Sequence, residues 1–284
     1  MTALSDREIT ESAPERRTRE GSLWRDGLAL LLPPFVTLVL IIAAWDYVSW
    51  RVLKPGRRWL LPSPNAVLHA GYSHADTRVQ LFNALGVTTE TAVIGLVIAI
   101  VIGVAIAVLM IQARWLERAV QPIAVVLQTT PLPVITPLFG FWWGYDLPSR
   151  LVVVVLIALF PIIVNTLDGL HQADATMHDL MTLHRAGRGA RLLKLQLPAA
   201  LPSFFTGLRI AGTNAVIGSV VADFFFKQGE PGLGILVDTY RAQVHLDQAL
   251  AAALLAILLG ATVFGLFSVL RHFVVGRWAP RRWS

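Results

Sequence analysis

The chain has 284 residues, of which 55% are hydrophobic and only 15% are charged, and its formal net charge at pH 7 is +6. Soluble domains carry about 25% charged residues, so most of this chain is not expected to face water. The absence of cysteine excludes disulfides and thiolate metal sites. In a chain this apolar, the basic excess is best explained by residues that orient membrane spans, and no nucleic acid partner is expected.

Residues 1–26 are polar and mixed in charge, and they are predicted to form a cytoplasmic tail rather than a signal peptide, because acidic residues interrupt the pattern. Long uncharged runs follow. They are Leu28–Trp45, Thr91–Ile111, Ala119–Tyr145, Leu151–Leu167, Ile210–Ala222 (extended by Phe224–Phe226) and Gln248–Leu270. A hydrocarbon core needs about 20 helical residues, and in lipid a helix satisfies its own backbone. The chain is therefore predicted to be an all-α integral membrane protein with about six transmembrane helices.

The lysines and arginines between these runs predict the orientation. If the N-terminus is cytoplasmic, the inner segments hold 16 of the 24 basic residues and the outer segments hold 8. This bias places both termini inside, although five of the outer residues lie in one long external loop. The expected division is a tail at 1–26, a first span and external loop at 27–90, a core at 91–271 and a cytoplasmic tail at 272–284.

Two of the expected spans carry polar or helix-breaking residues. In the third run, Pro131, Pro133 and Pro137 predict a broken helix. Such a break at membrane depth is tolerated where protein or a water-filled cavity covers it, or near a membrane face with no role in transport. The polar residues Gln128, Thr129 and Thr130 directly precede the break and favour a cavity.

The fifth run contains Asn214, Ser219 and Asp223. A polar group in a span usually faces the interior of a helix bundle or a pathway. Asp223 lies near the outer end of its run, so an ordinary interfacial carboxylate explains it equally well. The small residues of this run, Ala211, Gly212, Ala215 and Gly218, would allow a close approach of two helices.

The longest predicted cytoplasmic loop runs from Asp168 to Arg209 and includes a candidate coupling segment at 168–206. Thr176 and Asp179 have the spacing of a capping box, and a short helix is expected to follow. A second short helix is expected at Ala190–Leu197, ended by Pro198, after a break at Gly187 and Gly189. One mainly apolar face of the first helix is formed by Met177, Leu180, Met181 and His184. Such a face suits docking into a groove of another protein, or lying on the membrane surface.

Motifs for independent catalysis are missing from the sequence. No lysine follows a glycine in a phosphate-binding loop, no histidine precedes a glutamate in a metalloprotease motif, and no serine lies in a nucleophile elbow. No metal site is expected. The chain is therefore predicted not to be an enzyme, and energy for uphill transport would have to come from another subunit.

Four short segments, in order, carry a resemblance to a known family. They are Leu61-Pro62-Ser63-Pro64; Thr130-Pro131-Leu-Pro133 continuing to Pro137 and Gly144; Leu195-Gln-Leu-Pro198 continuing to Pro202, Gly207 and Arg209; and Pro231-Gly232-Leu233-Gly234, with a late Gly276-Arg277-Trp278. Together they resemble the permease subunits of binding-protein-dependent ABC importers, in the nitrate, taurine and sulfonate branch. The third segment resembles the end of that family's coupling loop.

The resemblance implies a type I importer fold, a homodimer, two ABC ATPase subunits on the cytoplasmic loops and an extracytoplasmic solute-binding protein. It implies no cofactor in this chain, with ATP bound by the partners. The coupling residues would be Met177, Asp179, Leu180, Met181, His184, Arg185, Gly187 and Pro198. Arg185 stands where the family has a glycine, so Gly187 is expected to supply the turn instead.

The translocation pathway is expected at the dimer interface. Its predicted residues are Gln128, Thr129, Thr130, Pro131, Pro133, Asn214, Ser219 and Asp223. The alternative is a secondary transporter or channel not coupled to ATP, which would need intramembrane ionisable groups; Asp223 and Arg209 are the two marginal candidates. The sequence does not identify the solute. Small anions, sulfonates and vitamin-precursor pyrimidines are the classes that the resemblance implies.

Overall fold

The computed structural model describes residues 23–276, and every regular element in this range is a helix. The predictions for residues 1–22 and 277–284 lie outside the described residues. The chain divides into two compact units, Met1–Arg58 and Trp59–Ser284, and each is described by itself.

The first unit is built on one long apolar helix. Helix α1 (Leu23–Tyr47) continues into the π-helical turn η2 (Val48–Val52), and the 3-10 helix η3 (Pro55–Leu60) follows. The guanidinium of Arg58 stacks over the ring of Trp50 at 4.5 Å and donates a hydrogen bond to the Trp50 carbonyl at 3.0 Å. This unit contains the expected first span.

The second unit is a bundle of long helices. Its first half comprises α2 (Pro64–Tyr72), α3 (Ala75–Gln112), α4 (Arg114–Thr129), α5 (Leu132–Trp143) and α6 (Leu147–His171). Its second half comprises α7 (Ala175–Leu183), α8 (Arg188–Arg191), the π-helical turn η4 (Leu192–Gln196), α9 (Leu197–Phe225), α10 (Leu233–Ala242) and α11 (Leu246–Val275).

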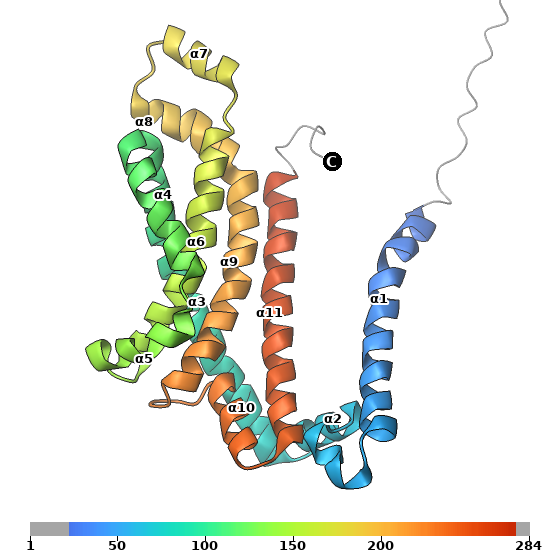
Figure 1. The fold of residues 1–284 in the computed structure, drawn as a ribbon. Helices are drawn as coiled ribbons and strands as arrows, with labels where there is room; N and C mark the ends of the chain where they lie inside the picture. Colours follow the sequence, from blue (N-terminus) through green and yellow to red (C-terminus); the bar gives the residue numbers. More distant parts are fainter. Residues whose placement is uncertain (1–22, 277–284) are drawn as a thin grey trace, which may run out of the picture. The chain divides into compact units, whose positions relative to one another are not determined.

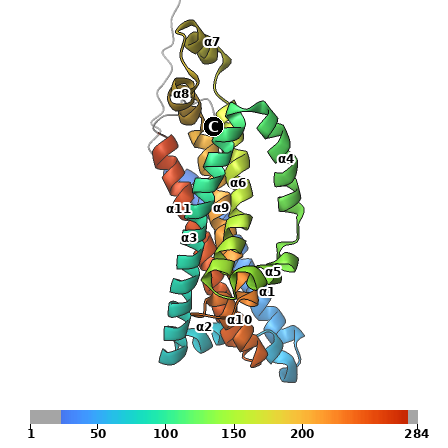
Figure 2. The same ribbon diagram turned by 90° about the vertical axis from the view of Figure 1, so that its left-hand side faces the viewer.

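Helices α3, α6, α9 and α11 form the centre of this bundle, with α6 and α9 packed along much of their lengths. Figures 1 and 2 show α7 and α8 at one end of the bundle and α2 and α10 at the other, here called the α7 end and the α10 end. Much of the core is small side chains: Ala99, Ala158 and Ala211 are fully buried where α3, α6 and α9 meet. Small residues allow such close approach of helices.

Five helical segments of the described residues are long and apolar enough to cross a membrane. They are Leu32–Val52, Ala75–Gln112, Leu147–His171, Arg188–Phe225 and Leu246–Val275. The all-α membrane fold predicted from composition is confirmed. The stretch predicted as an external loop before Thr91 is largely helical, because α3 begins at Ala75.

The third apolar run is not one helix. Helix α4 ends at Thr129 and α5 begins at Leu132, so the break predicted at Pro131 is confirmed. Pro137 lies inside α5 without ending it. Each of the two pieces is shorter than the hydrocarbon core requires of a single spanning helix.

The expected helix stop at Pro198 is wrong. Residues 188–225 run as one helical segment, with the π-helical turn at Leu192–Gln196 immediately before the proline. A proline lacks the backbone donor and clashes with the carbonyl four residues earlier, whereas a π-turn shifts the hydrogen bonds by one residue. Pro198 therefore sits in the first turn of α9, where prolines are tolerated.

The small residues of the fifth run allow the close approach of helices that was predicted, and they do so within one chain. Gly212 faces Phe267 and Val263 of α11, and Gly218 faces α6 at Val154 and Ile157. Ala211 and Ala215 are buried in the same core. These positions are therefore used for packing within one chain.

Candidate functional site

Helix α7 begins with a side-chain cap. Asp174 is its N-cap, and the Asp174 carboxylate accepts a hydrogen bond from the Thr176 backbone N–H at 2.7 Å. That bond, from the backbone of Thr176, is the main cause that lowers the pKa of Asp174. The capping box predicted from Thr176 and Asp179 is therefore wrong, because the cap lies two residues earlier.

The turn after α7 is closed by Arg185 itself. Arg185 has a φ of 52°, and its N–H donates to the Thr182 carbonyl at 2.9 Å, while the Ala186 N–H donates to the Met181 carbonyl at 2.9 Å. This pair of bonds is a Schellman motif, which normally has glycine at the left-handed position. Gly187 has a φ of −68° and does not supply the turn, contrary to the prediction.

The apolar face expected on α7 is exposed in the described chain. Met177, Leu180 and Leu183 are 49%, 47% and 80% exposed. Met181 is half-buried, and Asp179, His184 and Pro198 are exposed. A hydrogen bond from Arg191 to the Thr182 hydroxyl at 3.0 Å joins α8 to α7.

The proline break between α4 and α5 leaves its polar side chains on the surface of the bundle. Gln128, Thr129, Pro131 and Pro133 are exposed and Thr130 is half-buried. The hydroxyls of Thr129 and Thr130 both donate to the Val126 carbonyl, at 3.1 and 2.7 Å. The Val126 carbonyl also accepts the Thr130 backbone N–H at 2.9 Å, so both threonine hydroxyls bond to a carbonyl that already closes the end of α4.

The three polar residues predicted on the fifth span fall into two environments on α9. The side chain of Asn214 is half-buried and makes no hydrogen bond with another described residue. Ser219 and Asp223, by contrast, are 0% and 1% exposed. Asp223 is therefore not an interfacial carboxylate facing water, which was the alternative reading of its position.

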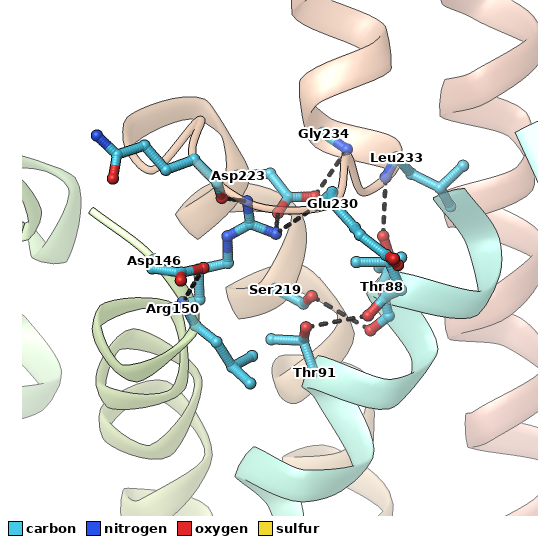
Figure 3. A network of polar contacts seen from close by, with 12 residues as sticks. Thr88, Thr91, Asp146, Arg150, Ser219, Asp223, Glu230, Leu233 and Gly234 are labelled. Carbon is cyan, nitrogen blue, oxygen red and sulfur yellow. Dashed lines mark hydrogen bonds and ion pairs between the residues drawn. The ribbon is translucent and has the colours of Figure 1, made fainter. Parts of the chain in front are cut away.

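A buried ion pair holds the α10 end together (Figure 3). Arg150, near the start of α6, lies 3.3 Å from the Asp223 carboxylate near the end of α9, and Arg150 is 3% exposed. The same guanidinium donates to the carbonyls of Gln228 and Glu230 in the loop after α9. The other Asp223 oxygen accepts the Gly234 N–H of α10 at 3.1 Å. One cation thus connects α6, α9 and the loop to α10.

Thr88 of α3 extends this network to a fourth helix. Its hydroxyl accepts the Leu233 N–H at 2.8 Å, and its carbonyl accepts the Ser219 hydroxyl at 3.2 Å. A Cβ on Gly232 would come under 3.0 Å from both Asp223 and Thr88, so only glycine fits there. Arg150, Thr88 and Gly232 were not among the predicted site residues. The Pro231–Gly234 motif was an available signal for Gly232, and the arginine before an apolar run was one for Arg150, whereas no motif marked Thr88.

No group of three or more potential metal ligands occurs among the residues that the structure describes. The arrangement at the α7 end offers apolar and basic side chains to another macromolecule. The arrangement at the α10 end is closed on itself and ties four helix segments together.

The comparisons with known proteins agree with this architecture. Residues 95–276 match the family described as "Binding-protein-dependent transport system inner membrane component". The formylaminopyrimidine transport permease protein ThiX of Halalkalibacterium halodurans is 32% identical over 244 residues, which cover 86% of this chain and 95% of the relative. A probable ABC transporter permease protein of Haemophilus influenzae is 31% identical over 242 residues, covering 85% and 96%.

The nitrate and sulfonate branch is represented among more distant relatives. The putative aliphatic sulfonates transport permease protein SsuC of Bacillus subtilis is 26% identical over 250 residues, covering 88% of this chain and 86% of the relative. A nitrate import permease protein of Synechocystis matches as well. The chain belongs to the family of inner membrane components of binding-protein-dependent transport systems, and it is a permease subunit of an ABC importer.

Proposed function

We propose that this permease works with a separate ATPase docked on the α7 segment, defined here as residues 175–196, and that a second copy of the chain completes the pathway. A solute-binding protein would deliver a small solute at the α10 end. The chain itself would neither bind nor hydrolyse ATP and would need no cofactor.

The exposed apolar face of α7 is the observation that carries this proposal. Leu180 and Leu183 are 47% and 80% exposed on a helix that stands apart from the bundle core. Basic side chains surround it, because Arg185, Arg188 and Lys194 are exposed as well. An apolar helix face that lies in a partner's groove, with charged residues at the rim, is a common mode of protein recognition.

The orientation of the chain in the membrane is inferred from the same α7 segment. A docked ATPase requires the α7 end to be cytoplasmic, and the positive charge of the α7 segment favours this side. Helix α11 ends at Val275 at the same end of the bundle, so the C-terminus would be cytoplasmic (Figure 1). With the charge distribution of the tail, both termini would be cytoplasmic and the α10 end would face outward.

The pathway is proposed to use the exposed polar residues around the proline break and on α9. These are Gln128, Thr129, Thr130, Pro131, Pro133 and Asn214. Ser219 and Asp223 belong to the buried network and would act by holding the helices that border the pathway. Their polar atoms are already bonded to Thr88, Arg150 and Gly234.

The docking proposal is tested by Leu180→Asp in the full chain. An uncompensated charge in a protein groove costs several kcal/mol, so co-purification of the ATPase should fall at least tenfold and transport should be lost. Ala175→Asp places the same charge on the opposite side of α7 and should leave ATPase binding unchanged. Normal ATPase binding by Leu180→Asp would refute the docking assignment. Failure of the unsubstituted chain to retain any ATPase would also refute the docking assignment.

A further inference from the structure

One face of α9 is left uncovered within the unit of residues 59–276. Helices α3, α6 and α11 cover the other sides of α9, since Ser219, Gly218 and Gly212 contact them in turn. The uncovered face is mainly polar toward the α7 end, where the exposed Ile210 interrupts it, and apolar toward the α10 end. Its exposed or half-buried residues are Thr206, Arg209, Ile210, Thr213 and Asn214 in the first half, and Ile217, Val220, Val221 and Phe224 in the second half.

Arg209 is the charged member of the polar half. Its guanidinium lies 4.7 Å from the ring of Phe264 on α11, a cation–π contact. Its Nε is buried without a hydrogen-bond partner, and it forms no ion pair with a described residue. Arg150, which is buried where Arg209 is half-buried, also leaves its Nε without a partner, but its guanidinium is paired with Asp223 and two carbonyls. The described residues around Arg209 therefore provide no negative charge to balance this cation within its span.

The depth of Arg209 makes this lack of compensation significant. Phe264 lies seven residues before Arg271 on α11, so Arg209 sits about 10 Å deeper in the bundle than Arg271. A charge at such depth is costly and is normally paired or exposed to a water-filled cavity. The side chain of Asn214, one to two turns further toward the α10 end, also has no hydrogen-bond partner among the described residues.

We infer that Arg209 is an anion-binding residue in the inner half of the pathway and that it takes the oxyanion group of a small solute. This inference rests on the proposed function. A planar guanidinium presents several N–H donors in a geometry that matches carboxylate, sulfonate and nitrate oxygens. The Phe264 ring of α11 packs against the guanidinium and restricts its position.

Two other groups could balance the charge of Arg209, a lipid phosphate or a second copy of the chain. Each predicts different surroundings for this face of α9. A lipid phosphate would need the face to be in contact with acyl chains, which excludes water from Thr213 and Asn214. A second copy of the chain would cover the face permanently and protect it in every nucleotide state. A solute site requires that water and small ions reach the face in at least one state.

The test uses Thr213→Cys as a reporter in the full chain, assembled with its ATPase in inside-out membrane vesicles. The native chain has no cysteine, so the reporter is the single thiol of this subunit. Thr213 is one helical turn from Arg209, at a Cβ separation of about 6 Å. The rates of modification by the sulfonatoethyl and trimethylammonioethyl methanethiosulfonates are measured and divided by their rates with a free thiol.

An arginine at this distance should raise the anionic-to-cationic rate ratio about tenfold over the ratio in Arg209→Gln. Arg209→Lys should keep most of the preference, and Arg271→Gln, the control, should leave it unchanged. Ethanesulfonate should slow the modification when Arg209 is present and not when it is glutamine. Equal ratios in the unsubstituted and Arg209→Gln backgrounds would overturn the inference, as would inaccessibility to both reagents in every nucleotide state. ATPase retention, measured on the same vesicles, reports separately on the proposed function.

Discussion

Charged side chains are arranged in opposite ways at the two ends of the core unit. At the α10 end, Arg150 and Asp223 are 3% and 1% exposed and bond to each other and to the backbone of the loop beside them. At the α7 end, Arg185, Arg188 and Lys194 are exposed and make no ion pair with a described residue. The α10 end thus satisfies its polar groups internally, whereas the α7 end leaves them available to a partner.

The same contrast appears in the apolar residues. Leu233 and Phe226 at the α10 end are fully buried, while Leu180 and Leu183 on α7 are exposed. The buried network at the α10 end and the exposed helix α7 therefore differ in what a substitution would disturb. Substitutions at the α10 end should act on folding, and substitutions at the α7 end should act on assembly with little effect on folding.

The largest effect is expected from Asp223→Ala. Removing one partner of a buried ion pair leaves an uncompensated charge and costs about 3–5 kcal/mol, so the yield of folded protein and the thermal midpoint in mild detergent should fall sharply. Glu117→Gln, which removes the exposed pair of Glu117 with His171 near the α7 end, should change the midpoint only slightly. Equal effects of the two changes would contradict the contrast between the ends.

A double substitution separates the charge effect from the packing effect. Arg150→Met combined with Asp223→Leu removes both charges together, and such replacements are often neutral because neither charge is left unpaired. The double variant should therefore be more stable than Asp223→Ala. If it is as unstable as the single variant, the loop carbonyls and the Gly234 N–H are more important than the ion pair.

Much of the fold could be predicted because lipid imposes a simple pattern on the sequence. The apolar runs predicted α1, α3, α6, α9 and α11, and the proline cluster predicted the break between α4 and α5. The pairing of Arg150 with Asp223 at the α10 end could not be predicted in this way. Arg150 and Asp223 are 73 positions apart, and the helix packing that joins them leaves no periodic signal in either segment.

The ends of the helices were harder to predict than the helices themselves, because several local arrangements of a helix end have similar free energies. Asp174 and Thr176 could each cap α7, and the sequence alone did not favour Asp174. Glycine is the usual left-handed residue after a helix, which favours Gly187 for the turn after α7, yet Arg185 adopts this conformation. Pro198 looked like a helix stop, and the π-turn before it removed the clash.

Two turns with a left-handed residue, at Val244 and at Arg185, lie at opposite ends of the core unit. Val244, like Arg185, closes a helix in the left-handed region, with a φ of 64°, and the His245 N–H donates to the Tyr240 carbonyl at 2.9 Å. A β-branched residue is especially unfavourable there. Glycine removes this strain but loses more unfolded-state entropy, so Val244→Gly should stabilise the protein by about 1 kcal/mol net.

Arg185→Gly should have a smaller effect, about half as large, since arginine is not β-branched. Hydrogen exchange of α7 should detect it, because a short helix without buried residues is expected to open locally, without a change in the global midpoint. Ala242→Gly, at an ordinary helical position of α10, should instead destabilise the protein by about 0.5–1 kcal/mol. A loss of stability in Val244→Gly would show that the valine side chain contributes more packing than strain.

The smallest expected effect concerns pH and the exposed charges beside the buried network. Hydrogen bonds from Lys227 and Arg241 lower the pKa of Asp238 on α10 below its usual 3.8. A carboxylate with a lowered folded-state pKa stabilises the protein fully above its unfolded-state value, and the contribution is lost as the pH falls through the folded value. These pairs are at the surface, so the contribution is about 0.5 kcal/mol.

The thermal midpoint of the native chain should exceed that of Asp238→Asn by a degree or two at pH 6, about the shift that this free energy gives. The difference should shrink as the pH falls below 3.8, and it should vanish only below the lowered folded-state pKa of Asp238. Glu230→Gln, an exposed change at the same end, should show no such dependence. A difference that persists at low pH would mean that Asp238 acts through packing rather than through its charge.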